Sequence, residues 1–274
     1  MTGFEQYRPT LFAVAYKMTK NAMDAEDILQ DVFLAYSRQE AASIVHPENY
    51  LVKAVIYRCF SLLEARKKTV YPGIDLPSPL FRERFSYIHD SDISFALLIL
   101  LQTLNPHERA VFLLRETFSY SYEEVAAILG LEQDHCRQLF HRAKEKIAAG
   151  KLRYIPAGEQ RNALLRAFVE ACSTGDTARL MACLKEDITI YSDGGGKVSA
   201  ARVPLTGRGT AAAFFLGIYA KQGAQLTFEV TEINGETGVI FHDATGAVDT
   251  VMILSMDTDG IHTVYFVRNP DKLC

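Results

Sequence analysis

A proline-rich stretch divides this chain of 274 residues and limits the folds open to it. Residues 71–79 read Tyr-Pro-Gly-Ile-Asp-Leu-Pro-Ser-Pro, with three prolines and one glycine. Because proline lacks a backbone N–H donor and fixes φ, neither a continuous helix nor a central strand can run through this stretch. We therefore expect a linker over residues 71–90, with separate domains on either side of it.

Helical periodicity fills both flanks of the linker. Before it, apolar residues such as Leu29, Val32 and Tyr36 recur at helical spacing, and three or four helices are expected in residues 1–70. After it, helical spacing resumes over residues 91–153. Capping residues and proline mark the helix starts, because both favour the first turn. The marked starts are Thr2, Asn21 and Pro47 in the first domain and Asn105 and Ser121 in the second.

The remainder, residues 157–274, mixes helices and strands. Helices over 159–173 and 177–185 precede a strand over 188–191, and a further helix is expected around 210–219. Asn-Gly, Thr-Gly and Asp-Gly turn signals then separate short β-rich runs. Strands are expected over 226–233, 237–242, 248–256 and 262–268. The sequence thus predicts a multidomain protein, with two all-α domains followed by an α+β domain.

The composition predicts a globular protein, and we expect it in the cytoplasm. Hydrophobic residues make up 49% of the chain and charged residues 23%. No run approaches the roughly 18 apolar residues that a membrane span needs, and the first residues lack a secretory pattern. The five cysteines are widely spaced and match neither a disulfide framework nor a zinc site. We expect no membrane partner, no metal and no cofactor.

The net charge of −4 hides a segregation of charge along the chain. Residues 1–156 hold 19 basic and 19 acidic residues, whereas residues 157–274 hold 10 and 14. Residues 136–153 are strongly basic, with six Lys or Arg and one acid. Because phosphate binding needs a local basic surface, this segment indicates a nucleic-acid contact in spite of the acidic average.

Residues 121–148 have the order of a helix-turn-helix. A capped helix ends at Gly130, which can adopt the left-handed cap conformation, and a second helix follows at once. The second helix has an apolar stripe on one side and a basic face on another. A helix with such a basic face can bind in the major groove of DNA. An αα-hairpin with a solvated charged face would give the same pattern. The stripe is Cys136, Leu139, Phe140, Ala143 and Ile147, and the basic face is Gln133, Arg137, His141 and Lys144.

Two further patterns precede the linker. Asp24, Asp27 and Asp31 share one helix face, and nothing basic at helical spacing in that helix compensates their repulsion. Such a face either stays in water or meets a basic partner. Residues 50–68 then interleave cations with aromatic residues, which suits unstacked bases as well as phosphates. Those aromatic residues could equally belong to the core.

The order of these features resembles a bacterial sigma factor of the extracytoplasmic-function (ECF) group. Residues 4–31 look like sigma region 2, and residues 91–153, with His-Arg-Ala-Lys at 141–144, look like region 4. Asp-Gly-Gly-Gly-Lys at 193–197 and Asn-Pro-Asp-Lys-Leu at 269–273 are similar to the SigJ-like subgroup, whose fused C-terminal domain is a cone-shaped SnoaL-like α+β fold. The linker departs from the Trp-Leu-Pro-Glu-Pro of that subgroup, because it has neither the Trp nor the Glu.

The resemblance implies a function and the residues that perform it. A sigma factor binds core RNA polymerase and directs it to promoter DNA. Core binding is then expected from Asp24, Glu26, Asp27, Gln30 and Asp31. Capture of the −10 element is expected from Tyr50, Lys53, Tyr57, Arg58, Arg66, Lys67 and Lys68. Reading of the −35 element is expected from Arg137, Gln138, His141, Arg142, Lys144 and Lys146.

The same resemblance implies that the domain at 157–274 regulates the sigma domains in cis. A tethered domain acts at high effective concentration, so weak contacts can bias the arrangement of the chain. Two segments are expected to contact the side formed by region 2 and the linker. They are Asp193, Gly194, Gly195, Gly196 and Lys197, and Asn269, Pro270, Asp271, Lys272 and Leu273.

Two alternatives stay open. A one-component DNA-binding regulator would use the C-terminal pocket to sense a small-molecule ligand. A cyclase or isomerase would carry the helix-turn-helix as a passenger and would use acid–base groups of the C-terminal domain. Those candidate groups are Tyr191, Asp193, His242, Asp249, His262 and Tyr265. Neither alternative gives the acidic face a role, so we expect a sigma factor and not an enzyme.

Overall fold

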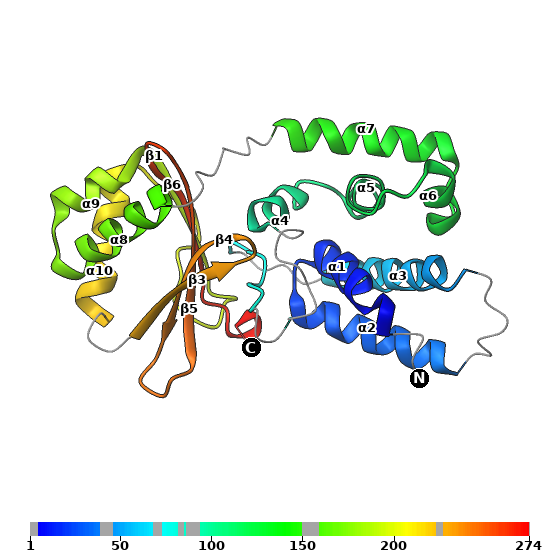
Figure 1. Cartoon of the computed structure of the whole chain (residues 1–274), viewed down its shortest axis with the longest axis horizontal. Coiled ribbons are helices and arrows are strands. Elements are labelled where there is room, and N and C mark those ends of the chain that lie inside the picture. Colours follow the sequence, from blue (N-terminus) through cyan, green and yellow to red (C-terminus); the bar gives the residue numbers. More distant parts are fainter. Residues whose placement is uncertain are drawn as a thin grey trace. The chain divides into compact units, whose positions relative to one another are not determined.

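The structure is a computed structural model (Figure 1). It describes residues 5–38, 46–67, 73–81, 85, 94–149, 159–222 and 227–273. The chain divides into two compact units, each assembled from two separate stretches of sequence. The first unit joins residues 1–70 to 82–151, and the second joins residues 71–81 to 152–274. None of the helices in the described ranges is both long and apolar enough to cross a membrane.

The first unit begins with three α-helices. After a 3₁₀ turn at Glu5–Tyr7 come α1 (Arg8–Thr19), α2 (Ala22–Ser37) and α3 (Pro47–Lys67). The predicted starts at Asn21 and Pro47 are confirmed, and the Asn21 side chain accepts from the backbone N–H groups of two residues in the first turn. The predicted start at Thr2 lies outside the described residues. The helices bury Phe12, Tyr16, Leu29, Leu51 and Ile56 between them.

Four more helices follow in the described residues of the first unit. They are α4 (Phe95–Leu101), α5 (Pro106–Phe112), α6 (Tyr122–Leu129) and α7 (Gln133–Ala149), with a π-helical turn at Leu113–Thr117 after α5. The predicted starts at Asn105 and Ser121 are confirmed, and each residue forms a capping box, Asn105 with Glu108 and Ser121 with Glu124. Gly130 ends α6 with φ at 65°, the left-handed cap that the sequence predicts.

The second unit is a six-stranded sheet in the described residues, with helices packed on one face (Figure 1). The strand order is β2-β1-β6-β5-β4-β3, in which only β1 and β6 run parallel. The strands are β1 (Leu184–Asp193), β2 (Leu205–Thr206), β3 (Thr227–Ile233), β4 (Glu236–His242), β5 (Val248–Asp257) and β6 (Gly260–Val267). The helices are α8 (Glu159–Thr174), α9 (Thr177–Cys183) and α10 (Arg208–Gln222).

The sequence placed the first strand of this unit too late. The helix predicted over 177–185 ends at Cys183, and β1 starts at Leu184 rather than at Ile188. Leu184, Ile188 and Ile190 pack into the core that the sheet shares with the helices. The two-residue strand β2 was not predicted, because a segment so short carries no periodicity.

The described part of the proline-rich stretch, residues 73–81, forms neither helix nor strand. Residues 76–80 are nevertheless buried, and this segment packs as part of the second unit. It lies on the sheet face opposite α8 and α10, where the Leu80 N–H donates to the Asn234 side chain at 3.0 Å (Figure 1). The stretch that links the two sets of helices is therefore an ordered layer of the α+β unit.

Candidate functional site

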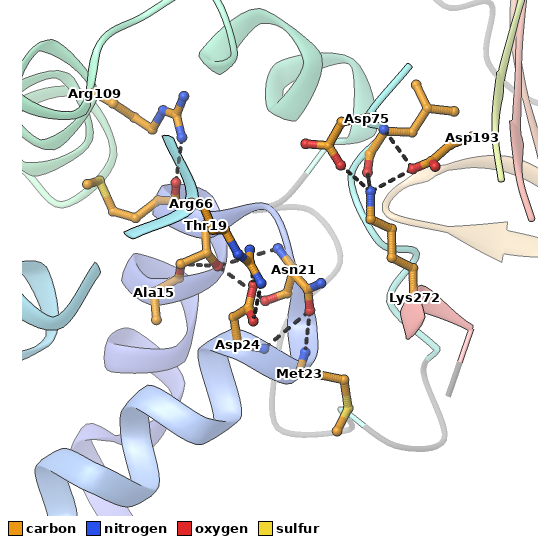
Figure 2. Close-up of polar contacts among 12 residues, drawn as sticks. Ala15, Thr19, Asn21, Met23, Asp24, Arg66, Asp75, Arg109, Asp193 and Lys272 are labelled. Atoms are coloured by element: carbon orange, nitrogen blue, oxygen red, sulfur yellow. Dashed lines mark hydrogen bonds and ion pairs between the residues drawn. The ribbon is translucent and has the colours of Figure 1, made fainter. Parts of the chain in front are cut away.

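The acidic face of α2 is partly paired within the first unit. Asp24 accepts two hydrogen bonds from the Arg66 guanidinium on α3, at 2.6 and 2.8 Å (Figure 2). Glu26 accepts from Arg8 on α1 at 2.9 Å. The compensation that α2 lacks in its own sequence thus comes from neighbouring helices. The remaining members of the predicted core-binding set, Asp27, Gln30 and Asp31, are exposed.

Two aromatic residues of α3 lie at the surface, and one of them also contacts α6. Tyr50 and Tyr57 are exposed, so the interpretation of these aromatics as core is wrong for both. The Lys53 ammonium lies 5.9 Å from the centroid of the Tyr57 ring. Tyr57 Oη also donates to the backbone carbonyl of Leu129 at 3.0 Å, and Lys53 lies within 3.5 Å of the carbonyl of Ala127. Two residues of the predicted −10 set therefore touch the end of α6.

The other predicted −10 residues lie toward the C-terminal half of α3 and carry ion pairs. Arg66 holds Asp24, as described above, and Lys67 pairs with Glu64 at 2.8 Å. Arg58 lies 3.7 Å from Asp31 of α2. Lys68 lies outside the described residues. Because the pairs of Arg58 and Lys67 are solvent-exposed, each is weak enough to exchange for a phosphate contact, whereas the Asp24 carboxylate held by Arg66 is only 14% exposed.

The pair α6 and α7 forms the predicted helix-turn-helix. Cys136, Leu139 and Ala143 of α7 are buried against the rest of the unit, while Phe140 and Ile147 are half-buried. The opposite side of α7 is exposed along its whole length. All six residues predicted to contact the −35 element lie on the surface: Arg137, Gln138, His141, Arg142, Lys144 and Lys146.

Lys146 has a structural contact in addition to its exposure. Its ammonium group donates to both carboxylate oxygens of Glu108, at 2.7 and 3.0 Å, and so joins α7 to α5. Burial alone would raise the pKa of Glu108, but the hydrogen bonds from Lys146 and from the Asn105 N–H outweigh it and lower the pKa. Of the six predicted −35 residues, Lys146 is thus the one anchored to a buried carboxylate.

A buried arginine connects the two helical halves of the first unit. The Arg109 side chain on α5 donates to the carbonyl of Met18 at the end of α1, at 2.5 Å (Figure 2). It also donates to the carbonyls of Leu101 and Leu104. Burial lowers the pKa of this guanidinium to about 10. Arg109 was not predicted as a buried residue, because it lies between Glu108 and Ala110 in the sequence and no apolar pattern marks it.

Lys272 lies at the centre of a buried polar cluster in the second unit. Its ammonium group donates to Asp193 Oδ2 at 2.6 Å, to the Leu76 carbonyl at 2.5 Å and to the Asp75 carboxylate (Figure 2). Asp193 also accepts from the backbone N–H of Leu76 at 3.0 Å. We call Asp75, Leu76, Asp193 and Lys272 the linker clamp. It fastens the proline-rich segment to the strand end of β1.

The two motifs at 193–197 and 269–273 contact each other. A Cβ atom on Gly195 would lie 2.3 to 2.5 Å from side-chain atoms of Asn269, so only glycine fits there. The Lys197 ammonium reaches the Asp271 carboxylate at 2.6 Å on the surface. A Cβ on Gly194 would meet the carbonyl oxygen of Val198 at 2.3 Å. The close approach of the two segments thus explains Gly195, whereas Gly194 is confined within its own turn.

Gly196, Pro270 and Leu273 complete the two predicted segments. Gly196 has a φ of 74° in the turn, a value that favours glycine. Pro270 opens the short 3₁₀ turn Pro270–Lys272 and is exposed, whereas Leu273 is half-buried after the turn. This turn directs the Lys272 side chain into the linker clamp. Asn234, which the sequence analysis did not single out, holds the other end of the proline-rich segment.

The acid–base candidates of the C-terminal domain do not converge on one place. Asp193 is buried in the linker clamp, and the stacked rings of Tyr191 and Tyr265, 5.5 Å apart, belong to the same two strands. Asp249 lies 3.5 Å from Arg268 near the end of β6. His242 contacts the Gly246 carbonyl, and His262 contacts the Thr263 hydroxyl. Each candidate thus has a local structural contact.

Both sets of helices in the first unit match known protein families. The family "Sigma-70 region 2" matches residues 4–69, and the family "Sigma-70, region 4" matches residues 94–147. These matches coincide with α1–α3 and with α4–α7. The chain is therefore a sigma-70 type protein that has region 2 and region 4.

Similarity over the full length of the chain identifies a narrower group within the sigma-70 type proteins. The chain is 26% identical over 99% of its length to the ECF RNA polymerase sigma factor SigJ of Mycobacterium tuberculosis, of which it covers 92%. It is 29% identical over 66% of its length to the probable ECF sigma factor SigI of the same species, of which it covers 66%. The crystal structure of M. tuberculosis SigJ superposes with a TM-score of 0.77 at 24% identity, covering 98% of this chain and 96% of that chain.

The chain is a SigJ-like ECF sigma factor, and the superposition on SigJ includes its α+β C-terminal domain. The prediction of the family and the prediction of the fold class, two helical sigma domains followed by an α+β domain, are both confirmed. The family is one of transcription factors and not of enzymes. The domain boundaries and the roles of individual residues stay predictions.

Proposed function

We propose that this chain binds core RNA polymerase and directs it to specific promoters, with its C-terminal domain acting as a regulator in cis. The observation that carries the proposal is the preformed helix-turn-helix within a chain that also has the acidic α2. Region 4 would place α7 in the major groove of the −35 element, because its whole outer side is polar and basic. The proposed domains are 1–70, 91–153 and 157–274, with the linker at 71–90.

The proposed core-binding surface is α2. Asp27, Gln30 and Asp31 offer exposed polar groups to a basic partner, whereas Asp24 and Glu26 contribute as residues already oriented by Arg66 and Arg8. A basic partner can therefore pair with Asp27 and Asp31 without breaking a strong ion pair, because the Arg58–Asp31 contact is long at 3.7 Å.

The proposed −10 reader is the exposed side of α3. Tyr50 and Tyr57 supply rings on which unstacked bases can lie, and Lys53, Arg58, Arg66 and Lys67 supply positive charge. Lys68 belongs to the same proposed set. The contact of Tyr57 and Lys53 with the α6 carbonyls occupies part of this surface.

This contact implies that the first unit opens when it binds a promoter. Elements named −35 and −10 lie about 25 base pairs apart, which is roughly 80 Å along B-DNA at about 3.4 Å per base pair. Tyr57 of α3 and Leu129 of α6 are 3.0 Å apart in the compact unit. The same unit cannot reach both elements, so region 2 and region 4 would separate on the promoter.

The proposed regulation acts through the linker clamp. The chain between α3 and α4 contains residues 73–81, which the second unit holds by buried hydrogen bonds. A segment held in this way cannot at the same time follow another path between separated regions 2 and 4. Release of the linker clamp would therefore change promoter activity. The regulatory set stays the predicted one, Asp193–Lys197 and Asn269–Leu273.

Binding to core polymerase tests the assignment of α2. Replacing Asp27 and Asp31 together by lysine should weaken binding of the full chain to core polymerase at least tenfold, because two attractive contacts become repulsive. Glu170→Lys on α8 is the matched charge reversal outside the sigma regions and should leave binding unchanged. Equal binding by wild type and the double variant would overturn the assignment.

Run-off transcription tests the regulation. Asp75→Ala removes one partner of Lys272 without leaving a buried charge unpaired, and it should change transcription by the full chain several-fold. Arg179→Ala removes only a surface ion pair of the second unit, with Glu170 at 2.8 Å, and serves as the control because Arg179 lies outside the regulatory set. The same activity in wild type and Asp75→Ala, at equal core binding, would contradict a regulatory role of the linker clamp.

A further inference from the structure

The second unit contains a cavity of about 470 Å³ on the helix-covered side of its sheet. It lies between α10 and the strands β1, β4, β5 and β6, and the chain at residues 199–201 closes one side. A volume of this size is typical of sites for small organic ligands. The linker clamp lies on the other face of the sheet, so the cavity is separate from the site described above.

The walls of the cavity are mainly aromatic. Phe214 of α10, Phe241 of β4 and Phe266 of β6 line it, and the rings of Phe214 and Phe266 meet edge-on at 5.5 Å. A smaller cavity of about 160 Å³ adjoins it and shares Phe241, Phe266 and Ile218 as lining residues. An occupant would therefore place an apolar body, with flat or chain-like parts, against these rings.

One side of the cavity is polar and carries a positive charge. The Arg268 guanidinium is fixed there by the Thr250 hydroxyl at 3.1 Å and the Ser199 carbonyl at 2.8 Å, and Asp249 lies 3.5 Å away. Asp249 compensates the charge of Arg268. Lys221 of α10 also lines the cavity and makes no hydrogen bond or ion pair with any residue in the described ranges. The lining thus carries one uncompensated positive charge.

We propose that this cavity binds an amphipathic monoanion, a small molecule with an aromatic or aliphatic body and one carboxylate. The body would pack among the three phenylalanines, and the carboxylate would meet Lys221 and the free N–H donors of Arg268. A charged head that leaves water for this rim needs such a partner, whereas a cationic head would be repelled by Lys221. The proposal concerns binding alone and does not depend on promoter activity.

Three probes with one body and different heads test the proposal on the full chain. They are 4-phenylbutyrate, 4-phenylbutanol and 4-phenylbutylamine, each titrated by calorimetry and by ligand-observed saturation-transfer NMR. We expect the carboxylate to bind at least fivefold more tightly than the alcohol, and the amine to bind more weakly than the alcohol. Equal affinity of the three probes, or no binding at millimolar concentration, would overturn the proposal.

Three variants locate the site, two of which form a matched pair. Gly217 lines the cavity, and a Cβ placed there meets no atom within 4 Å, so Gly217→Leu fills the space without a clash at Cβ. It also replaces glycine by a strong helix former, which favours a folded α10. Gly209→Leu is the matched control, because Gly209 lies on the same helix, has equally open space and does not line the cavity.

The expected outcomes distinguish the contribution of the cavity's volume from that of the Lys221 charge. Gly217→Leu should abolish binding of all three probes, whereas Gly209→Leu should bind them as the wild type does. Lys221→Met should reduce the affinity for 4-phenylbutyrate to that for 4-phenylbutanol and leave the alcohol unchanged. Binding that survives Gly217→Leu would place the site elsewhere, and a carboxylate preference that survives Lys221→Met would contradict the assigned charge.

Discussion

The ammonium group of Lys272 lies 2.6 Å from the carboxylate of Asp193, and both side chains are almost fully buried, at 7% and 0% exposure. Removal of one partner from such a pair leaves the other charge buried and uncompensated, which costs far more than the pair itself contributes. This pair joins the C-terminal motif to β1 and, through Leu76, to the proline-rich segment. It is therefore a stability element of the second unit that also holds the proline-rich segment in that unit.

Lys272→Ala should lower the free energy of unfolding of the second unit by about 3 kcal/mol. Lys197→Ala is the control, because the Lys197–Asp271 pair has the same length but is 55% and 60% exposed, where solvent screening leaves about 0.5 kcal/mol or less. Urea unfolding followed by circular dichroism measures both variants. Equal losses in the two variants would contradict the assignment of the buried pair.

Gly195→Ala should destabilise the chain more than Gly175→Ala does. Both glycines have positive φ, at 60° and 71°, so alanine is strained by a similar amount at either position. Only at Gly195 would the added Cβ also collide with Asn269. We expect an additional loss of about 2 kcal/mol at Gly195, measured by thermal unfolding. A smaller loss at Gly195 than at Gly175 would show that the two motifs do not approach so closely.

Tyr57→Phe should loosen the contact between α3 and α6. It removes the hydrogen bond to the Leu129 carbonyl and keeps the ring, at an expected cost of about 1 kcal/mol to the stability of the first unit. Tyr50→Phe, also on the exposed side of α3, has no hydroxyl contact with a described residue and should cost much less. Chemical unfolding of the two variants in parallel makes the comparison, and identical curves would contradict it.

The Glu108–Lys146 contact should make the stability of the first unit decrease at acidic pH. The pKa of Glu108 is lowered in the folded chain, so its contribution is fully present above the pKa of the unfolded chain, about 4.3, and is lost as pH falls through the folded value. Glu108→Gln should cost about 1.5 kcal/mol at pH 7, because the carboxylate is only 3% exposed.

The cost of Glu108→Gln should shrink as pH falls below the unfolded value of about 4.3, and it should be smallest once the pH has passed the lowered folded pKa and the wild-type carboxyl group is protonated as well. Unfolding free energies measured between pH 3 and pH 7 give this profile. A difference between wild type and variant that stays constant over the whole range would show that the Glu108 charge does not stabilise the fold.

The sequence predicted what depends on neighbours in the chain. The capping boxes of α5 and α6 and the left-handed Gly130 follow from residues within four positions of each other. The linker clamp could not be derived in the same way, because Asp75 and Lys272 are separated by 197 positions. The resemblance indicated the two motifs, whereas the fold showed that they contact each other and the proline-rich segment.

The least predictable contacts are those between backbone carbonyls and distant side chains. Arg109 reaches the Met18 carbonyl across 91 positions, and no pattern of residue types encodes a carbonyl that a helix end leaves without a partner. The pairing of Asp24 with Arg66 has a similar origin, since α2 and α3 must pack before the two charges meet. Such contacts are fixed by tertiary packing and not by local sequence.

Run-off transcription with purified bacterial core polymerase is the most direct test that the chain is a promoter-specific sigma factor. With the full chain added, transcripts should start at a defined promoter, and the Asp27→Lys and Asp31→Lys double variant should reduce them at least tenfold. A chain that binds the promoter duplex by itself but neither binds core polymerase nor initiates would contradict the account and identify a one-component regulator instead.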